Sequence, residues 1–265
     1  MYRAIDIHAH LGTPDGFPQK GLGKSFLNRS PDQVERSYRQ QNIVAGSFSP
    51  MEGIFPADEY TLLKANETMQ ELSETYPWIY QWVIVDPLFP ASYRQAEELL
   101  KTPKCIGVKL HPDGNGYPIA VYGEEIFSFC SQFDAVVETH TGDPMSQPEE
   151  FVPFADRYPN VKIILSHIGC GFDGCLSRQT DAVRRGKNHN LYTDTSSGKS
   201  ILNGLIEWAS DQVAEDRILF GTDSPIHHIG MMKQRIETAE ISENRRKDIL
   251  CRNAEKLFPG VFDRI

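Results

Sequence analysis

Eight short runs of apolar and β-branched residues recur along this chain, at intervals of roughly 25 to 40 residues, and the segments between them have helical periodicity. The runs occupy residues 4–11, 42–49, 80–87, 105–112, 134–142, 161–169, 191–197 and 217–225. A strand followed by a helix, repeated eight times in 265 residues, matches the size of one (β/α)8 barrel. The sequence therefore predicts an α/β fold with a single barrel domain over residues 1–265.

Capping residues and prolines mark the expected helix boundaries. Ser30 before Pro31, and Ser242 further along, are favourable residues for the position preceding a helix. Further helices are expected to begin near Pro56, Pro90, Pro148 and Ser200. Pro77 and Pro159 are expected to end the preceding helices, because proline lacks the N–H that would extend them.

An open, doubly wound sheet is the structural alternative to a barrel. Such sheets usually carry a glycine-rich phosphate loop after the first strand, and here that strand leads into HLGTPDG instead. No linker rich in proline, glycine and serine divides the chain. The barrel is therefore the preferred prediction.

The charge balance excludes one class of partner. Lysine and arginine total 27 against 36 aspartate and glutamate residues, giving a formal net charge of −9, whereas nucleic-acid binding needs a local excess of cations. No run approaches the roughly 18 consecutive apolar residues of a membrane span. We expect a small-molecule partner, no nucleic acid and no membrane insertion. A homo-oligomer is possible, because barrel enzymes associate through helix faces that sequence does not single out.

The cysteines and the opening residues indicate a cytoplasmic protein. The five cysteines are scattered and include no C-x-x-C pair, so we interpret them as free thiols in a reducing compartment. Asp6, His8 and His10 interrupt the apolar stretch that a signal peptide would require, so we expect the mature chain to begin at Met1.

Histidines gather at the carboxyl ends of the predicted strands. The residues at these ends are His8, His10, His111, His140 and His167, with Asp223 at the end of the eighth strand. In a parallel barrel all the carboxyl ends face one mouth, where barrel enzymes have their active sites. One such histidine is usually a hydrogen-bonded core residue, but an apolar barrel interior gains no stability from several imidazoles and a carboxylate at one level. The set therefore predicts a functional site.

His8 and His10 lie two residues apart on one strand, so both side chains are expected to point into the barrel and to hold one cation between them. His140 and Asp223 are expected to complete the metal shell. Imidazole and carboxylate ligands are typical of zinc, and Mn²⁺ or another transition metal would also suit them. We predict one divalent metal ion, most simply Zn²⁺.

Six phrases in the chain, DIHAHLG, GVKLHP, ETHTG, NVKIILSHIG, ILFGTDSP and NAEKLF, resemble in order the amidohydrolase-related branch of the amidohydrolase superfamily. That branch also contains decarboxylases similar to aminocarboxymuconate semialdehyde decarboxylase. The resemblance implies a metal barrel with His8, His10, His140 and Asp223 as ligands. It further implies that His167 on the sixth strand is a catalytic or substrate-binding group.

Lys109 leaves two alternatives open. Two-metal members of the superfamily carry a carbamylated lysine at this position, which would bridge a second metal ion. A free ammonium would be repelled by a dication, so as a cation Lys109 should instead pair with Glu138 or bind an anionic substrate. We favour the cation and one metal. His111, two residues further on, either contacts the substrate or serves as a turn residue before Pro112.

Metal-dependent hydrolysis is the expected function, on a small carboxylate-bearing amide, lactone or cyclic ester. A bound metal makes hydroxide available near neutral pH, Asp223 would accept its proton, and His167 would bind the oxyanion or donate a proton. The alternative is a metal-dependent, non-oxidative decarboxylase of an unsaturated or aromatic acid. A third interpretation, a barrel that binds metal without catalysis, would need a shell closed by protein ligands.

Several neighbouring residues are weaker candidates. Asp6 is expected on the same face as His8, where it would orient a metal ligand or pair deep in the barrel. His227 and His228 either line the mouth or lie on the surface, and residues 17–26 form either a lid or an ordinary loop.

Overall fold

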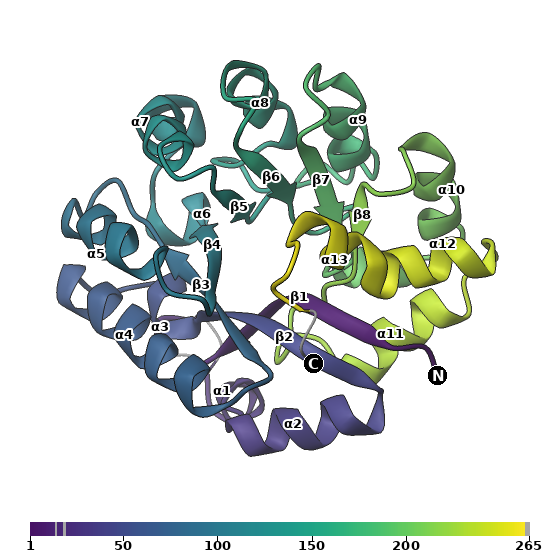
Figure 1. The fold of residues 1–265 in the computed structure, drawn as a ribbon, viewed down its shortest axis with the longest axis horizontal. Helices are drawn as coiled ribbons and strands as arrows, with labels where there is room; N and C mark the ends of the chain where they lie inside the picture. The colour runs from purple at the N-terminus through teal and green to yellow at the C-terminus, as the bar shows by residue number, and fades with distance from the viewer. Residues whose placement is uncertain (14, 18–19, 263–265) are drawn as a thin grey trace.

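A computed structural model of the chain describes residues 1–13, 15–17 and 20–262. Its eight parallel strands pair in sequence order and surround a central axis, as Figure 1 shows. The strands are β1 (Ala4–Leu11), β2 (Ile43–Pro50), β3 (Ile79–Ile84), β4 (Cys105–Leu110), β5 (Val136–Thr139), β6 (Lys162–Leu165), β7 (Leu191–Asp194) and β8 (Ile218–Leu219). The predicted (β/α)8 barrel is confirmed.

The barrel closes between its first and last strands. Ile7 N donates to Phe220 O at 3.0 Å, and Ala9 pairs with Ser224 in a parallel bridge. The predicted eighth strand, 217–225, is longer than observed β8, because regular pairing stops at Leu219. Beyond that point Asp223 adopts a left-handed backbone conformation, with φ at 55°, and donates its N–H to His8 O. This bend places the Asp223 side chain beside the end of β1.

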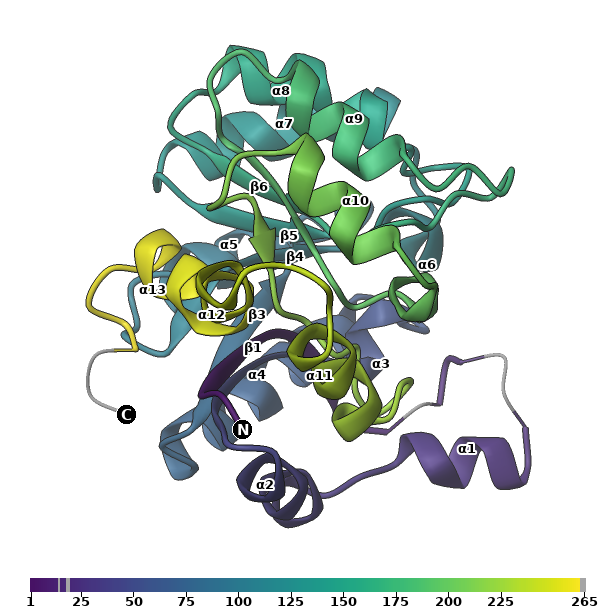
Figure 2. The same cartoon turned by 90° about the vertical axis from the view of Figure 1, so that its right-hand side faces the viewer.

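Helices alternate with the strands and cover the outside of the barrel (Figure 1). They are α1 (Leu22–Leu27), α2 (Pro31–Gln40), α3 (Met51–Ile54), α4 (Glu59–Thr75), α5 (Ala91–Leu99), α6 (Pro112–Asn115), α7 (Ile119–Ser131), α8 (Val152–Arg157), α9 (Arg178–Arg185), α10 (Leu205–Gln212), α11 (Ile229–Glu237), α12 (Glu243–Lys247) and α13 (Asn253–Leu257). In Figure 2 the short helices α1, α3 and α6 lie at one end of the barrel, and α13 and the N-terminus lie toward the other. None of the helices in the described part of the chain has the length and apolar character needed to cross a membrane.

Side-chain capping accounts for several helix starts. Ser30 forms a capping box with Gln33 at the start of α2, and Ser242 caps α12, as predicted. The helix expected near Pro56 begins at Glu59, because Asp58 accepts a hydrogen bond from Thr61 N. Near Ser200 the chain forms only a 3₁₀ turn, Gly198–Ile201, and α10 begins at Leu205.

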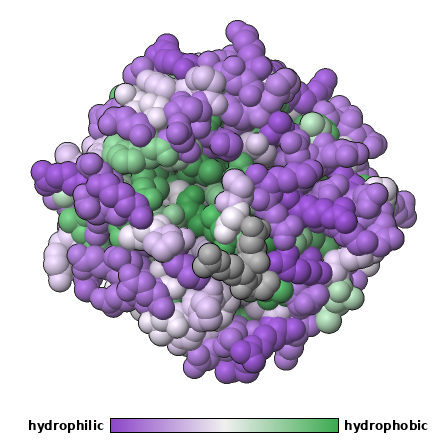
Figure 3. Space-filling view, viewed as in Figure 1, coloured by the Kyte–Doolittle hydropathy of each residue, from purple (hydrophilic) through white to green (hydrophobic). Residues whose placement is uncertain are grey.

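Apolar residues fill the amino-terminal half of the barrel. Ile5, Ile7, Trp82, Ile164 and Leu219 form one buried cluster with residues of the carboxyl-terminal segment that follows β8. Figure 3 shows hydrophobic residues near the centre of the face seen in Figure 1, surrounded by hydrophilic ones. The polar residues of the interior are therefore confined to the other end, where the strands finish.

Candidate active site

A small pocket lies at the carboxyl ends of the strands, where the sequence predicted the site. Its volume is about 250 Å³, below the range of roughly 300–1,000 Å³ typical of pockets for drug-sized ligands. Polar residues from five strand ends and four apolar residues line it: His8, His10, Lys109, His111, His140, Asp143, His167 and Asp223, with Phe17, Ile54, Phe55 and Ile226. The pocket suits a small molecule that is polar at one side and apolar at the other.

Three groups among the described residues have metal-ligand geometry: His8, His10 and Asp223; His8, His167 and Asp194; and Asp113, His140 and Asp143. The first combines the two β1 histidines with Asp223, as the sequence predicted. Each residue of this first group is buried, and each offers one ligand atom such that the three atoms lie within 4.8 Å of one another. Asp223 Oδ1 lies 3.0 Å from His10 Nε2 and 3.5 Å from His8 Nε2. Two imidazoles and a carboxylate are a common donor set for divalent transition metals, and three protein ligands leave positions open for substrate.

The other nitrogen of each imidazole contacts a partner that orients the ring. His8 Nδ1 lies 2.9 Å from Asp194 Oδ2 and 2.5 Å from Glu138 Oε1, and His10 Nδ1 lies 2.8 Å from Ser49 Oγ. Contacts of this kind fix the tautomer of metal-binding histidines and raise their basicity. In both rings Nε2 is therefore directed toward Asp223.

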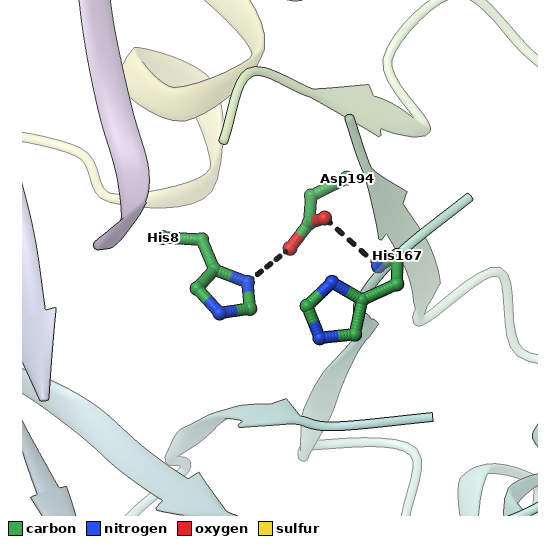
Figure 4. Close-up of side chains that lie close together, drawn as sticks. All are labelled: His8, His167 and Asp194. Atoms are coloured by element: carbon green, nitrogen blue, oxygen red, sulfur yellow. Dashed lines mark hydrogen bonds and ion pairs between the residues drawn. The ribbon is translucent and has the colours of Figure 1, made fainter. Parts of the chain in front are cut away.

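Asp194, at the end of β7, is the functional residue that the sequence prediction missed. Figure 4 shows its carboxylate between the His8 ring and the backbone of His167, whose N–H donates to Asp194 Oδ1 at 3.0 Å. Ser196 also donates to Oδ1, from both its N–H and its hydroxyl. The signal was present, because Asp194 lies three residues before the end of the seventh predicted strand, 191–197, much as Asp223 lies two residues before the end of the eighth, 217–225.

Asp6 was predicted on the face of His8, and this is wrong. The pairing of β1 with β2 has an irregularity between Asp6 and Ala9, which breaks the alternation of faces. The Asp6 carboxylate instead accepts hydrogen bonds from Tyr38 of α2 and from Thr222. Burial raises its pKa to about 6. Asp6 contacts only the backbone of His8, and Asp194 orients the ring.

Lys109 is paired with Glu138. Its Nζ donates to Glu138 Oε1 at 2.9 Å and lies 3.1 Å from His8 Nε2, with both Lys109 and Glu138 fully buried. Ser166 donates a further hydrogen bond to Glu138 Oε1. This arrangement supports the cation rather than the carbamate.

His167 presents an acceptor to the pocket. The Ser196 hydroxyl donates its one proton to Asp194, so it accepts from His167 Nδ1 at 2.8 Å. In the neutral ring Nε2 is then unprotonated. Burial and the neighbouring His140 lower the pKa of His167 well below its usual value, which keeps the ring neutral. A neutral His167 with this tautomer cannot donate to an oxyanion through Nε2.

His140 lies outside the group formed by His8, His10 and Asp223. Its Nδ1 is 3.0 Å from His167 Nε2, and its Nε2 is 2.7 Å from Asp143 Oδ2. Both ring nitrogens therefore have partners within the site. Its predicted place in the metal shell stays a prediction.

The charges of the site follow from burial and pairing. Burial alone would lower the pKa of His8, but Glu138 and Asp194 outweigh it and raise that pKa to about 10. Burial likewise opposes the ionisation of Asp194, but His8 and Ser196 lower its pKa to about 2. Burial lowers the pKa of His10, and the Asp223 carboxylate only partly offsets this.

His227 and His228 have separate positions. His227 Nε2 lies 3.8 Å from Asp223 Oδ2, and its side chain is 29% exposed. His228 instead accepts a hydrogen bond from Met231 N at the start of α11. Of the predicted lid, Phe17 lines the pocket and packs against Phe55 with ring centroids 4.8 Å apart, while residues 18–19 lie outside the described residues.

A family model described as amidohydrolase matches residues 5–260, so the chain belongs to the amidohydrolase family. Over 121 residues the chain is 32% identical to the gamma-resorcylate decarboxylase of Polaromonas sp. (strain JS666 / ATCC BAA-500). That match covers 39% of this chain and 36% of the relative, so it spans about a third of the length of that curated protein.

Three solved structures share the whole fold. The 2,6-dihydroxybenzoate decarboxylase from Rhizobium has a TM-score of 0.78 at 16% identity, covering 97% of this chain and 99% of that one. The dihydroxybenzoic acid decarboxylase of Polaromonas sp. JS666, with bound manganese and the inhibitor 2-nitroresorcinol, has a TM-score of 0.78 at 20% identity, covering 97% of each chain. The 5-carboxyvanillate decarboxylase from Novosphingobium aromaticivorans DSM 12444, complexed with manganese and 4-hydroxy-3-methoxy-5-nitrobenzoic acid, has a TM-score of 0.74 at 16% identity, covering 97% of this chain and 96% of that one.

These comparisons correct the functional prediction. The relative and the three solved structures are decarboxylases of aromatic acids, so the expectation of hydrolysis is wrong. Hydrolysis was slightly preferred to decarboxylation because the residue set that includes Lys109 resembles that of two-metal hydrolases, and Lys109 pairs with Glu138. The manganese in two of these structures also departs from the zinc that we expected.

Proposed function

We propose that this protein is a metal-dependent, non-oxidative decarboxylase of small, single-ring aromatic carboxylic acids. The observation that carries the proposal is the composition of one pocket of about 250 Å³. A buried metal-ligand group and an ammonium lie on one side of it, and Phe17 and Phe55 lie on another. The decarboxylases among its relatives support the same reaction.

The residues of the pocket fit a divalent cation. Glu138, Asp194 and Asp223 are buried carboxylates, and Lys109 is the one buried ammonium among the described residues that line this pocket. A histidine must lose its proton to bind a metal, and with His8 deprotonated these four groups sum to two negative charges, which a dication would neutralise. His8, His10 and Asp223 would hold the ion, with His140 proposed as a further ligand. When bound, a divalent metal acts as a Lewis acid on substrate oxygens and fixes the orientation of the substrate.

Decarboxylation of an aromatic acid replaces a carboxylate by a hydrogen. The bond between the ring carbon and the carboxylate carbon breaks, its electron pair stays on the ring carbon, that carbon gains a proton, and carbon dioxide leaves. The protein must therefore bind an anion and deliver one proton to carbon.

Asp223 is the residue that we assign to proton delivery. Its Oδ1 contacts His10, which leaves Oδ2 to carry a proton to the ring carbon. His227 lies 3.8 Å from Oδ2 and is partly exposed, so it can replace the proton from solvent. Asp223 thus serves both as a metal ligand and as the acid.

Lys109 and His167 are assigned to substrate binding. The Lys109 ammonium, buried beside His8, attracts the substrate carboxylate while Glu138 holds it in place. His167 Nε2 would accept a hydrogen bond from a substrate hydroxyl in place of the one from His140 Nδ1, because its own proton resides on Nδ1.

The test is turnover of defined acids by protein of known metal content. Protein stripped with chelator and reloaded with Mn²⁺ or Zn²⁺ should convert at least one hydroxylated benzoate to carbon dioxide and the matching phenol, in equal amounts. The stripped protein should be inactive, and His10→Ala protein should carry less metal and lose turnover. If metal-loaded protein releases no carbon dioxide from any hydroxylated or methoxylated benzoate, the proposal is wrong.

The proposal also includes a cellular location for the protein. All five cysteines are free in the structure, as a reducing cytoplasm would keep them. We retain the cytoplasmic location as a prediction on this ground, with a small aromatic acid as the partner.

A further inference from the structure

His111 has an arrangement that metal chemistry does not require. It follows β4 and precedes α6, and its Nδ1 accepts a hydrogen bond from Gly114 N at 2.9 Å. Pro112 occupies the first turn of that helix, so the sequence HPDG fixes both the cap and the position of the ring. The sequence left two roles open for His111, a pocket residue or a turn residue before Pro112. In the structure His111 has both positions.

The cap determines which ring nitrogen carries the proton. A backbone N–H can only donate, so Nδ1 must be an unprotonated acceptor, and the proton of the ring is on Nε2. Among the residues that the structure describes, no hydrogen-bond partner is found for Nε2. His111 therefore offers a donor without a partner, on a ring that cannot gain a proton on Nδ1 without losing its cap.

The neighbours of His111 hold its ring in the pocket wall. On one side it stacks on His140, with ring centroids 4.1 Å apart and an angle of 13° between the planes. On the other side Phe55 lies 5.5 Å away, and Phe17 packs against Phe55. The His111 ring is thus packed between the His140 imidazole and the Phe55 ring, and these contacts restrict its rotation.

Ring contacts link His111 to the other imidazoles of the pocket. The imidazoles form a series. The ring centroids of His8 and His167 lie 4.9 Å apart, and those of His167 and His140 lie 4.8 Å apart. His111 follows His140 in this series. A single-ring acid with its carboxylate beside Lys109 and His8 would share one small pocket with His111 and Phe55, so an oxygen on its ring can lie within reach of His111.

We propose that His111 determines specificity for aromatic acids that bear an oxygen substituent on the ring in addition to the carboxylate, by donating a hydrogen bond from Nε2 to that oxygen. This inference rests on the proposed function, whose substrate class it narrows. A substrate without such an oxygen would forgo the hydrogen bond from Nε2 and bind less tightly.

Two variants separate the donor from the cap. His111→Asn keeps a short acceptor for Gly114 N, because asparagine is a favourable cap residue, but removes the donor to the pocket. His111→Gln keeps an N–H near the position of Nε2 and loses the cap. Unfolding temperatures of both variants report the structural cost independently of ligand binding.

The measurement is the affinity of Mn²⁺-loaded protein for benzoate, 3-hydroxybenzoate and 4-hydroxybenzoate by titration calorimetry. In the unaltered protein at least one of these hydroxyls should tighten binding by about 3- to 10-fold, the usual value of one hydrogen bond. The gain, expressed as the ratio to benzoate, should disappear in His111→Asn and persist in His111→Gln. An equal gain in His111→Asn, or no gain and no binding in the unaltered protein, would overturn the inference.

The same samples distinguish this inference from the proposed function. Carbon dioxide release is followed with each ligand. A gain that depends on His111, without turnover of any acid, would reject decarboxylation and leave the specificity role standing. If aromatic acids are turned over but the hydroxyl group tightens binding equally in all variants, decarboxylation would stand and the specificity role of His111 would be rejected.

Discussion

At the scale of single residues, the metal affinity of this site depends on the partner that contacts the second ring nitrogen of each metal-binding histidine. Asp194 contacts His8 Nδ1, while Ser49 is the corresponding partner of His10. The two partners differ in charge, since one is a buried carboxylate and the other a hydroxyl. A carboxylate behind an imidazole raises its basicity more than a hydroxyl does.

Asp194→Asn should therefore weaken metal binding by about 10- to 100-fold, because the amide must present its N–H₂ either to His8 Nδ1 or to the N–H groups of His167 and Ser196. Ser49→Ala should weaken it less. Competition with a chromogenic chelator measures both constants. Equal affinity in Asp194→Asn and the unaltered protein would remove Asp194 from this role.

The buried pair of Lys109 and Glu138 makes a second prediction at this scale. Lys109→Met should cost about 3 kcal/mol of unfolding free energy, because Glu138 loses its main partner, and the double variant with Glu138→Gln should recover part of that cost. Metal content should stay the same. The exposed pair Lys64–Glu67 provides the control, since Lys64→Met should cost less than about 1 kcal/mol. A mass increase of one carbon dioxide on Lys109, or a drop from two metals to one, would support the carbamate instead.

At the scale of secondary-structure elements, the residue at which each strand ends determines where these side chains lie. The sequence identified His8, His10, His167 and Asp223, because strand ends can be recognised from short β-branched runs and turn residues. It failed for Asp6, since the irregularity in β1 depends on pairing with β2 and not on local pattern. It also could not give ring orientations such as those of His140 and His111, which are set by contacts between distant strands and loops.

A pair of helices provides a pH-dependent test of the outer layer. Glu207 of α10 accepts two hydrogen bonds from Arg235 of α11, at 3.0 and 2.5 Å, and these lower its pKa from 4.5 to about 2. The folded state therefore holds this proton less tightly than the unfolded state. The stabilisation that the Glu207–Arg235 pair gives the folded state is complete above about pH 5 and is lost as the pH falls through 4.5 toward 2.

Glu207→Gln should accordingly reduce the unfolding free energy by about 1–2 kcal/mol at pH 7, allowing for partial exposure of the pair, and by much less at pH 2.5. Denaturant unfolding at the two pH values measures the difference. Glu243→Gln, in the exposed pair with Lys247, is the matched control and should have little effect at either pH. A loss of equal size at both pH values would contradict the assigned role of the ion pair.

At the scale of the whole molecule, metal binding and stability are coupled. The proposed ion would join β1 to the segment after β8, where the barrel closes through few backbone hydrogen bonds. A ligand that binds only the folded state at 1,000 times its Kd adds about 4 kcal/mol. Removal of the metal should therefore lower the Tm by several degrees, as calorimetry with and without chelator would show. The Tm of His8→Ala protein should not respond to chelator.

Proton transfer to ring carbon is the step that distinguishes this account from every hydrolytic one. The metal-loaded protein should be incubated in D₂O with each hydroxybenzoate that it turns over, and the phenol analysed by mass spectrometry and NMR. The account predicts one deuterium on the carbon that carried the carboxylate, and no such product from Asp223→Asn protein. Loss of substrate without a new carbon–deuterium bond, or an undiminished rate in Asp223→Asn protein, would contradict it.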